Sequence, residues 1–420
     1  MAEKTRDQTN RHQRTTTPTI GIGIAGLGAA GRAFVAPMQS HPGVCLAAIA
    51  EPADSVRAEF ANRHGVQTYA SVDAMLEHPG LDAVYIATPT ALHPQHVAQA
   101  AAAGKHILVE KPMAATLGQA RDMIAAAERA GVVLVVGHSH SHDLPVRHMR
   151  RIIAQGDLGA VMMANTWCFT DWMHRPRRAD ELDAAQGGGV TYRQGSHQFD
   201  ILRLLCGGRV RSVRARTFAA GPGRPAIGAH VVYLDFENGA AATAVYNGYG
   251  GLSSAELCFD IGEWGHVQPP GQRRRPSAAL GAATPSSADI LRAKQERARK
   301  AIPSNAPHQP FFGLTLVSCE QGDIRQSPQG LYMYADGERS EIALPTHRSP
   351  RDLVVSEFHD AVRGIAPALH DGRWGLANLE VCAAAIESSA HGREVRLQHQ
   401  VAVPAGAETS LDANAPLPSR

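Results

Sequence analysis

The sequence Thr19-Ile-Gly-Ile-Gly-Ile-Ala-Gly-Leu-Gly-Ala-Ala-Gly31 decides the fold of this chain. An apolar segment, typical of a buried strand, runs into Gly26, Gly28 and Gly31 and then into an alanine-rich stretch that can be helical. At this spacing the first glycine allows a tight turn. The second lets the backbone approach a pyrophosphate, and the third lets the helix pack on the strand. We therefore expect a dinucleotide-binding turn that includes Ala29 and Ala30, with phosphate at the helix N-terminus.

An acidic residue follows this turn at the expected distance. Glu51 lies 20 residues after Gly31, at the end of the apolar segment Cys45–Glu51. A carboxylate there accepts hydrogen bonds from a ribose diol and repels a 2′-phosphate, which favours NAD over NADP. Arg57 lies close enough in sequence to keep NADP as an alternative.

Working outward, strands and helices alternate up to about residue 140. Further apolar strands are expected over 81–88, 106–109 and 132–138, with helices between them. Strands that are apolar on both faces and alternate with helices are typical of a parallel sheet covered on both sides. Residues 19–140 are therefore predicted to form one doubly wound Rossmann domain.

The next part of the chain has a different pattern. Strand-like segments dominate residues 141–350, including 254–267, and helix returns at 351–393. Glu237-Asn-Gly239 and Asp336-Gly337 are hairpin signals. We predict an α/β protein whose C-terminal α+β domain, residues 141–397, has a mainly antiparallel sheet. Residues 1–18 and 398–420 are expected to be tails, and 268–310 a mobile insertion with a basic helix near 288–301.

Composition narrows the class of protein. The 420 residues carry a formal charge of +2, which argues against a dedicated nucleic-acid binder. No apolar run approaches the ~20 residues of a membrane span, and the polar N-terminus lacks a signal-peptide core. The six cysteines are dispersed, so we expect reduced thiols and a cytoplasmic protein with no membrane partner.

Two further motifs follow predicted strands. Thr88-Pro89-Thr90-x-x-His93 comes after the strand at 81–88, and Glu110-Lys111-Pro112 comes after His106-Ile-Leu-Val109. With Gly26–Gly31 and the later Gly187–Leu205 segment, these motifs resemble the Gfo/Idh/MocA family of oxidoreductases. The resemblance implies a Rossmann domain, an open antiparallel sheet and nicotinamide-linked oxidoreduction. It also implies a homodimer or homotetramer formed through the sheet faces.

The resemblance assigns roles to several residues. Lys111 is expected beside the nicotinamide, bonded to the reacting hydroxyl, and His197 is the candidate acid or base. Thr88, Pro89, Thr90, His93 and Glu110 are expected at the cofactor with Lys111. The residues themselves agree, because Lys111 lies past a strand end where ligands bind. Ser196 can start a helix whose positive end keeps His197 neutral, and Asp200 can orient the imidazole ring or cap the helix.

One position departs from the family pattern. Sugar and inositol members carry Asp four residues before this histidine, where the present chain has Arg193. Arginine cannot act as a base, but it can hold a carboxylate with two parallel hydrogen bonds. Trp172, Arg177 and Arg178 lie on a loop expected at the substrate, although acidic neighbours are alternative partners for the arginines and the core is an alternative place for Trp172. We therefore expect a small anionic substrate that is planar or ring-shaped.

Three stretches, 137–150, 165–182 and 187–200, resemble the phthalate cis-4,5-dihydrodiol dehydrogenases within this family. That resemblance implies oxidation of 4,5-dihydro-4,5-dihydroxyphthalate to 4,5-dihydroxyphthalate, with Lys111 or His197 taking the proton. The alternatives are a sugar, inositol or acidic-sugar dehydrogenase, and a non-catalytic dinucleotide sensor.

Three histidines alternate along Gly137-His-Ser-His-Ser-His142. On a strand, His138, His140 and His142 would share one face, an arrangement that permits a metal site. The implied chemistry needs no metal, so we predict none and place His140 in the substrate pocket.

Overall fold

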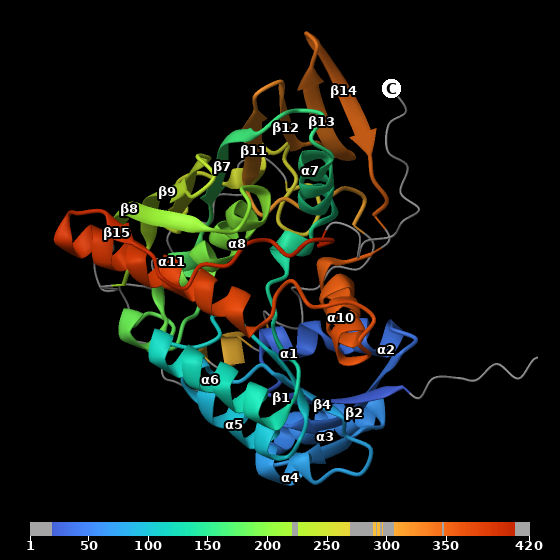
Figure 1. The fold of residues 1–420 in the computed structure, drawn as a ribbon. Coiled ribbons are helices and arrows are strands. Elements are labelled where there is room, and N and C mark those ends of the chain that lie inside the picture. The colour runs from blue at the N-terminus through green and yellow to red at the C-terminus, as the bar shows by residue number, and fades with distance from the viewer. Residues whose placement is uncertain are drawn as a thin grey trace, which may run out of the picture.

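The computed structural model describes residues 19–220, 226–268, 289–290, 292–294, 296, 306–346 and 348–407. Two sheets organise these residues (Figure 1). The predicted fold class, a Rossmann domain followed by a domain with a mainly antiparallel sheet, is confirmed. The expected tail at 1–18, residues 408–420 and most of the expected insertion lie outside the described residues.

The first sheet has six parallel strands in the order β3-β2-β1-β4-β5-β6. The strands are β1 (Ile20–Ala25), β2 (Val44–Ala50), β3 (Gln67–Tyr69), β4 (Ala83–Ile86), β5 (His106–Val109) and β6 (Leu134–Val136). The chain order reverses between β1 and β4, which is where ligands bind in open sheets of this type. The candidate site lies at this switch point.

Helices cover both faces of this sheet. They are α1 (Ala29–Ala33), α2 (Val35–Ser40), α3 (Asp54–His64), α4 (Val72–Leu76), α5 (His93–Ala102) and α6 (Leu117–Ala130). Buried side chains of α5 and α6 join one hydrophobic core, whereas those of α2 and α3 join a second core on the opposite face. The alternation predicted from sequence thus gives a sheet that is buried on both sides.

The glycine turn after β1 has the geometry that its spacing predicts. Gly26 has a φ of +93°, which disfavours other residues, and a Cβ added at Gly31 would lie 1.9 Å from the Gly26 carbonyl oxygen. A Cβ at Gly28 would meet no described atom within 4 Å. Gly31 therefore permits close packing, and Gly28 leaves open space above the turn, as a bound pyrophosphate requires.

The second sheet has nine strands in the order β14-β13-β12-β11-β7-β10-β9-β8-β15. They are β7 (Val161–Phe169), β8 (Val210–Phe218), β9 (Ala229–Phe236), β10 (Ala241–Asn247), β11 (Leu314–Cys319), β12 (Gly322–Gln326), β13 (Gly330–Ala335), β14 (Glu338–Ala343) and β15 (Val395–Arg396). Among the described strands of this sheet, only β7 and β10 pair in parallel. Asp336 and Gly337 both have positive φ, as their hairpin signal predicts.

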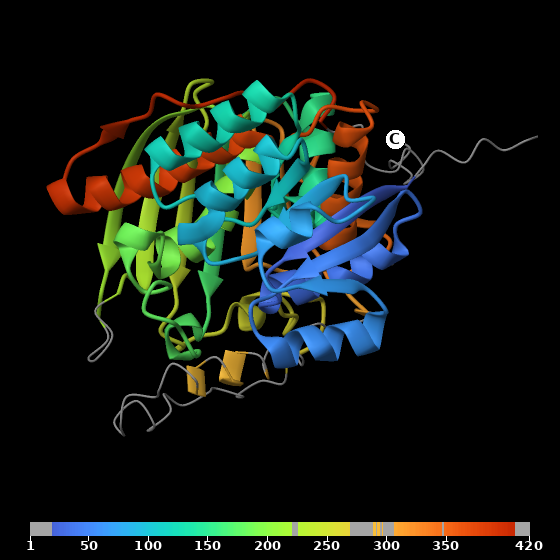
Figure 2. The same cartoon turned by 90° about the horizontal axis from the view of Figure 1, so that it is seen from below.

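One face of this sheet is covered by helices. They are α7 (Leu144–Gln155), α8 (Ser196–Leu205) and α11 (Gly372–His391), and Figure 2 shows the red α11 along the sheet. Side chains on the other face stay exposed, including Met163 at 48%, Trp167 at 45% and Val231 at 47%. The sheet is therefore open on an apolar face.

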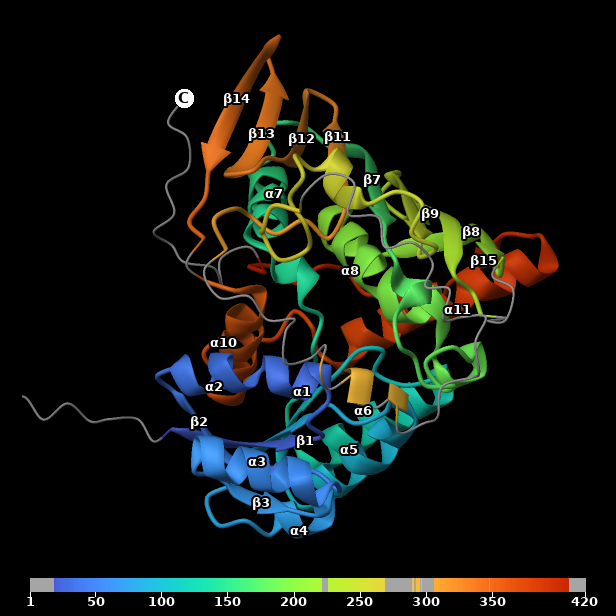
Figure 3. The same cartoon turned by 180° about the vertical axis from the view of Figure 1, so that it is seen from behind.

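The C-terminal part of the chain returns to the Rossmann domain. Helix α10 (Pro350–Val362) packs on α2, and α11 packs on α6, as Figures 1 and 3 show. After β15, the Glu380 carboxylate accepts hydrogen bonds from the backbone N–H groups of Gln398 and His399. No helix in the described ranges is both long enough and apolar enough to cross a membrane.

Candidate active site

Glu51 lies beside the glycine turn at the end of β2. Its carboxylate accepts hydrogen bonds from the backbone N–H of Leu27 at 2.9 Å and of Ala53 at 3.2 Å. Arg57 donates to the carbonyl oxygens of Glu51 and Pro52, at 2.7 and 2.8 Å, and pairs with Asp54. The guanidinium is thus held by acceptors within the protein, while Glu51 faces the turn. Together with Gly28 and with Ala29 and Ala30 of α1, this arrangement fits NAD.

Replacing Glu51 with Gln should raise the Kd for NAD by roughly 10- to 100-fold, because a hydrogen bond to a charged acceptor contributes about 1.5–3 kcal/mol. Isothermal titration with NAD measures the change. Asp54→Asn is the matched control, because it removes the same charge from an acid whose side chain is 91% exposed. If both variants lose the same affinity for NAD, a specific contact of Glu51 with the ribose is contradicted.

His93 links the loops that follow β4 and β5. Its Nε2 lies 3.0 Å from the Thr88 carbonyl oxygen, and its Nδ1 lies 3.2 Å from that of Met113. Burial lowers the pKa of His93 to about 4, so the ring is neutral and donates to one of the two oxygens. Pro89 precedes the buried Thr90 in the intervening turn. His93 thus holds both motif loops at the cofactor edge.

Glu110 has partners inside the protein. Its carboxylate accepts a hydrogen bond from the Tyr85 hydroxyl at 2.6 Å and another from the backbone N–H of Lys111 at 3.2 Å. These contacts tie Glu110 to β4 and to the backbone of Lys111, and its place at the cofactor stays a prediction.

Lys111 joins the two domains at the centre of the site. Its Nζ donates a hydrogen bond to the backbone carbonyl oxygen of Arg193 at 3.1 Å. Burial lowers the pKa of Lys111 to about 8, against the opposing effect of Glu110. An amine with this pKa is divided between its neutral and charged forms near pH 8, which suits proton transfer.

His197 is buried at 4% exposure, and its Nδ1 has no hydrogen-bond partner among the described residues. Helix α8 begins at Ser196, as predicted, and a π-helical turn, Thr191–Gly195, leads directly into it. The pKa of His197 lies well below its usual value because of burial, and the charge of Lys111 lowers it further. The ring is therefore neutral for a different reason from the predicted helix dipole.

Asp200 does not orient His197, contrary to one sequence-based expectation. It accepts a hydrogen bond from the Trp374 indole at 2.7 Å and lies 3.5 Å from Nε2 of His370. Its role is structural, inside the helical layer. The expectation failed because a three-residue spacing on a helix does not determine which neighbouring helix lies closer.

Arg193 occupies the π-helical turn just before His197. Its Nε and Nη2 are buried, and neither atom has a hydrogen-bond partner within the described part of the chain. Leaving buried polar groups unpaired is costly, and a buried charge is costlier still. The guanidinium is therefore placed to receive an anionic ligand.

The two other candidate arginines have different surroundings. Arg177 lies 3.9 Å over the ring of the buried Trp172 and 3.7 Å from the Glu181 carboxylate. Arg178 donates two parallel hydrogen bonds to Asp180, at 2.8 and 2.7 Å. Both arginines therefore pair with acidic residues of their own loop, which are the alternative partners that the sequence offers. Of the expected insertion's basic helix, Lys294 is described, and it pairs with Glu181 at 2.6 Å.

His140 belongs to a short 3₁₀ turn, His140–His142, so the three alternating histidines do not share a strand face. Its Nδ1 lies 3.1 Å from the Asp143 carboxylate, and its ring stacks on Phe312 with centroids 4.2 Å apart. The ring also contacts His197 edge to face, at 4.6 Å. Burial opposes protonation of His140, but Asp143 and Glu263 raise its pKa to about 9. The ring is therefore a cation beside His197.

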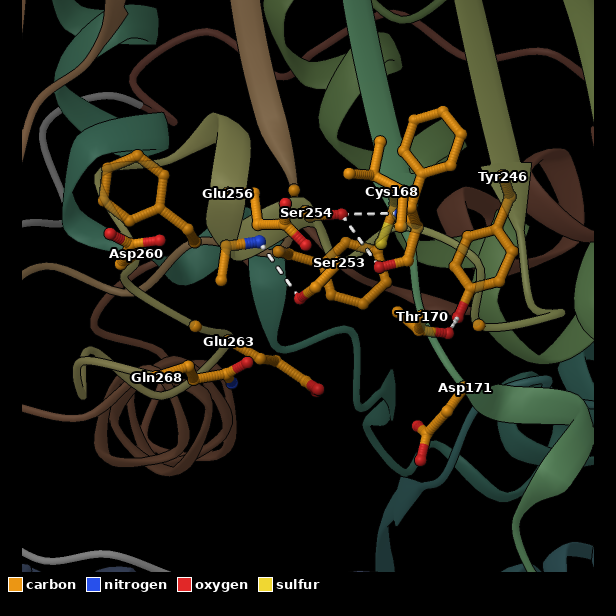
Figure 4. Close-up of a pocket in the computed structure, with 18 of the residues that line it drawn as sticks. Cys168, Thr170, Asp171, Tyr246, Ser253, Ser254, Glu256, Asp260, Glu263 and Gln268 are labelled. Carbon is orange, nitrogen blue, oxygen red and sulfur yellow. Dashed lines mark hydrogen bonds between the residues drawn. The ribbon is translucent and has the colours of Figure 1, made fainter. Parts of the chain in front are cut away.

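A cavity of about 460 Å³ adjoins this group (Figure 4). Glu263 and Phe312 belong both to its lining and to the surroundings of His140. The strand predicted over 254–267 is wrong, because this segment forms a short 3₁₀ turn, Ser254–Leu257, and then an irregular loop. Sequence reasoning missed Glu263, Asp143 and Phe312, because no local pattern marks a loop residue that meets His140 only in the fold.

His142 and His370 lie behind the site, against Glu357 of α10. His370 Nδ1 lies 2.8 Å from the Glu357 carboxylate, and its Nε2 lies 2.8 Å from the Ser141 hydroxyl. His142, Glu357 and His370 offer ligand atoms within 4.8 Å of one another. Since both nitrogens of His370 have protein partners, we interpret the group as a buried ion pair; the absence of a metal stays a prediction.

Replacing Glu357 with Gln should lower the free energy of unfolding by about 3 kcal/mol near pH 6, because it leaves buried charge unpaired. Burial opposes protonation of His370, but the carboxylates of Glu357 and Asp200 raise its pKa to about 9. In turn, the charge of His370 holds the pKa of Glu357 well below its usual range. The contribution of His370 to the free energy of unfolding is complete below pH 6.5 and is lost as the pH rises through about 9. The contribution of Glu357 is lost as the pH falls through its lowered pKa.

Urea unfolding at pH 6 and pH 9.5 measures the difference in free energy of unfolding between the wild-type protein and Glu357→Gln. This difference should be smaller at the higher pH. Glu387→Gln, which breaks an exposed pair with Arg393, is the control. If Glu357→Gln lowers the stability by the same amount at both pH values, the ion pair is ruled out as the cause.

Comparison with known proteins places these features in a family. Residues 20–138 match the model described as "Oxidoreductase family, NAD-binding Rossmann fold", and residues 146–253 match the GFO/IDH/MocA C-terminal domain. The chain belongs to the Gfo/Idh/MocA family of oxidoreductases. It is an NAD-binding dehydrogenase.

Particular relatives narrow the resemblance. The 1-carboxy-3-chloro-3,4-dihydroxycyclohexa-1,5-diene dehydrogenase of Comamonas testosteroni is 34% identical over 381 residues, covering 87% of this chain and 94% of that protein. The rhizopine catabolism protein MocA of Rhizobium meliloti is 34% identical over 47% of this chain and 60% of its own length. A solved structure from Bordetella bronchiseptica RB50 is 40% identical with a TM-score of 0.84, covering 90% of this chain and all of that one.

Proposed function

We propose that this dehydrogenase oxidises a carboxylated cis-dihydrodiol, 4,5-dihydro-4,5-dihydroxyphthalate, to 4,5-dihydroxyphthalate. The observation that carries the proposal is Arg193, whose buried Nε and Nη2 lack hydrogen-bond partners among the described residues. The backbone of the same residue binds Lys111. A carboxylate fits such a guanidinium through two charge-assisted hydrogen bonds. The Comamonas relative, whose name specifies a carboxylated dihydroxycyclohexadiene, supports the same substrate class.

The residues divide the chemistry between them. Bound NAD supplies the hydride acceptor, and the protein handles the proton of the reacting hydroxyl. Neutral Lys111 accepts this proton more readily than His197, because its pKa of about 8 lies near neutral pH whereas that of His197 lies far below. His197 then offers a neutral ring as a hydrogen-bond partner for the hydroxyl. Loss of the hydride and of the hydroxyl proton leaves a ketone. The neighbouring ring carbon then gives up its hydrogen as a proton while the ketone oxygen takes one back, which completes the aromatic product.

The test is a direct assay. The protein is mixed with NAD and, separately, with the phthalate dihydrodiol, inositol, glucose and an acidic sugar, and reduced nicotinamide is followed by its absorbance. Turnover of the dihydrodiol supports the proposal. Turnover of a sugar or inositol, with none of the dihydrodiol, would reject it in favour of a sugar dehydrogenase. Tight NAD binding without any turnover would indicate a dinucleotide sensor.

We also propose that the protein assembles as a homodimer or homotetramer through the open face of the nine-stranded sheet. Met163, Trp167, Val231 and Tyr233 are each between 45% and 48% exposed on this face. An apolar surface of this kind is typical of a protein interface. Light scattering after gel filtration measures the assembly.

A further inference from the structure

The Glu263 carboxylate lines the cavity and takes no part in the proton transfer proposed for Lys111 and His197. Its side chain is 34% exposed, and it lies on the loop after the Ser254–Leu257 turn. Figure 4 shows it extending into the cavity, toward the side where Asp171 lies. Since the cavity is large enough for a single ring, a ligand there would meet this carboxylate.

The position of Glu263 is fixed from behind. Its Oε1 lies 3.5 Å from Nε2 of His140, and Nδ1 of His140 lies 3.1 Å from the buried Asp143 carboxylate. Phe312 stacks on the imidazole and limits its rotation. A carboxylate, an imidazolium and a second carboxylate therefore form a continuous chain that ends at the cavity.

Glu263 is ionised and has an electrostatic environment distinct from that of Arg193. Burial alone would raise the pKa of Glu263, but His140, Arg175 and Arg351 lower it to about 2. The charged neighbours that most affect Arg193 are Glu181, Asp180 and Arg178. Glu263 thus offers a carboxylate and Arg193 a guanidinium at two separately positioned points, and both charges affect the pKa of Lys111.

An ionised carboxylate suits one part of the proposed substrate. Its two oxygens accept hydrogen bonds from two neighbouring hydroxyl groups, and it repels another carboxylate. We propose that Glu263, positioned by His140 and Asp143, binds the vicinal diol of the substrate and so determines which end of the ring approaches Lys111. This inference rests on the proposed function, because it assumes a ring with a diol at one end and carboxylates at the other.

The experiment measures binding without turnover. The probes are 4,5-dihydroxyphthalate, which carries both groups, and phthalate, which lacks the hydroxyls. Their Kd values for the enzyme–NADH complex are obtained from nicotinamide fluorescence. Glu263→Gln should weaken 4,5-dihydroxyphthalate by roughly 10- to 100-fold and leave phthalate unchanged or tighter, because only the former donates hydrogen bonds to the carboxylate.

Three further variants sharpen the result. Arg193→Gln should weaken both probes, and Glu256→Gln, which removes an exposed carboxylate from the same cavity, should weaken neither. Glu263→Asp keeps the charge and should recover part of the preference for the dihydroxy probe, which separates diol recognition from misfolding. Equal weakening of both probes by Glu263→Gln, or no weakening of either, overturns the inference. If the wild-type complex binds neither probe, the proposed function itself fails.

Discussion

Replacing Lys111 with Met should lower kcat by about 10³-fold, within the range that general acid–base catalysis contributes. The variant loses the amine that we propose takes the hydroxyl proton, whereas the glycine turn and Glu51, which we expect to hold NAD, lie elsewhere on the sheet edge. Rapid mixing with NAD and saturating substrate measures kcat. Isothermal titration should show that the Kd for NAD changes by less than about threefold.

The pH dependence makes this prediction specific. In the wild-type enzyme, kcat/KM should rise with pH and level off above about 8, because burial lowers the pKa of Lys111 to that value and the neutral amine is the acceptor. Lys111→Met should lose this rise. Lys105→Met is the matched control, because Lys105 donates to the Leu81 carbonyl oxygen, away from the proton-transfer residues. An unchanged kcat with a weaker Kd for NAD would assign Lys111 to cofactor binding alone.

Replacing Arg193 with Gln should raise KM for the dihydrodiol by about 100-fold, with a smaller change in kcat. Removing one partner of a buried charge pair costs roughly 2–5 kcal/mol, and the loss of a carboxylate contact falls on substrate binding. The backbone bond from Lys111 to residue 193 does not depend on the side chain. Steady-state kinetics with saturating NAD separates KM from kcat.

Arg178→Gln provides the comparison for this variant. Since Arg178 already donates two hydrogen bonds to Asp180, its loss should raise KM much less than the loss of Arg193. A KM that stays constant in Arg193→Gln would reject the anionic-substrate assignment. A parallel rise in the KM for NAD would move Arg193 to the cofactor site.

The sequence predicted those features that depend on neighbours along the chain. Gly26, Gly28 and Gly31 have the separate roles that their spacing indicates, since a turn and a close helix contact are local requirements. Glu51 lies beside the turn because parallel strands end at the same edge. Arg193 was notable in the sequence because it replaces an expected Asp, and the structure gives it buried, unpaired nitrogen atoms among the described residues.

Features that depend on distant segments were missed or wrong. The alternation of His138, His140 and His142 suggested a strand, but the chain turns after β6, so that His140 faces His197 and His142 faces His370. Glu263 enters the site from a loop predicted as a strand. Such contacts are set by how α8, α10 and the 254–268 loop pack together, which spacing along the chain does not specify.

The bond between Lys111 and residue 193 has a consequence for substrate choice. The lysine amine binds the backbone carbonyl oxygen, so the hydrogen bond survives any exchange of the side chain at that position. Under the proposed function, an exchange of the side chain at residue 193 can therefore change which substrate is bound while the contact that holds the Lys111 amine is kept.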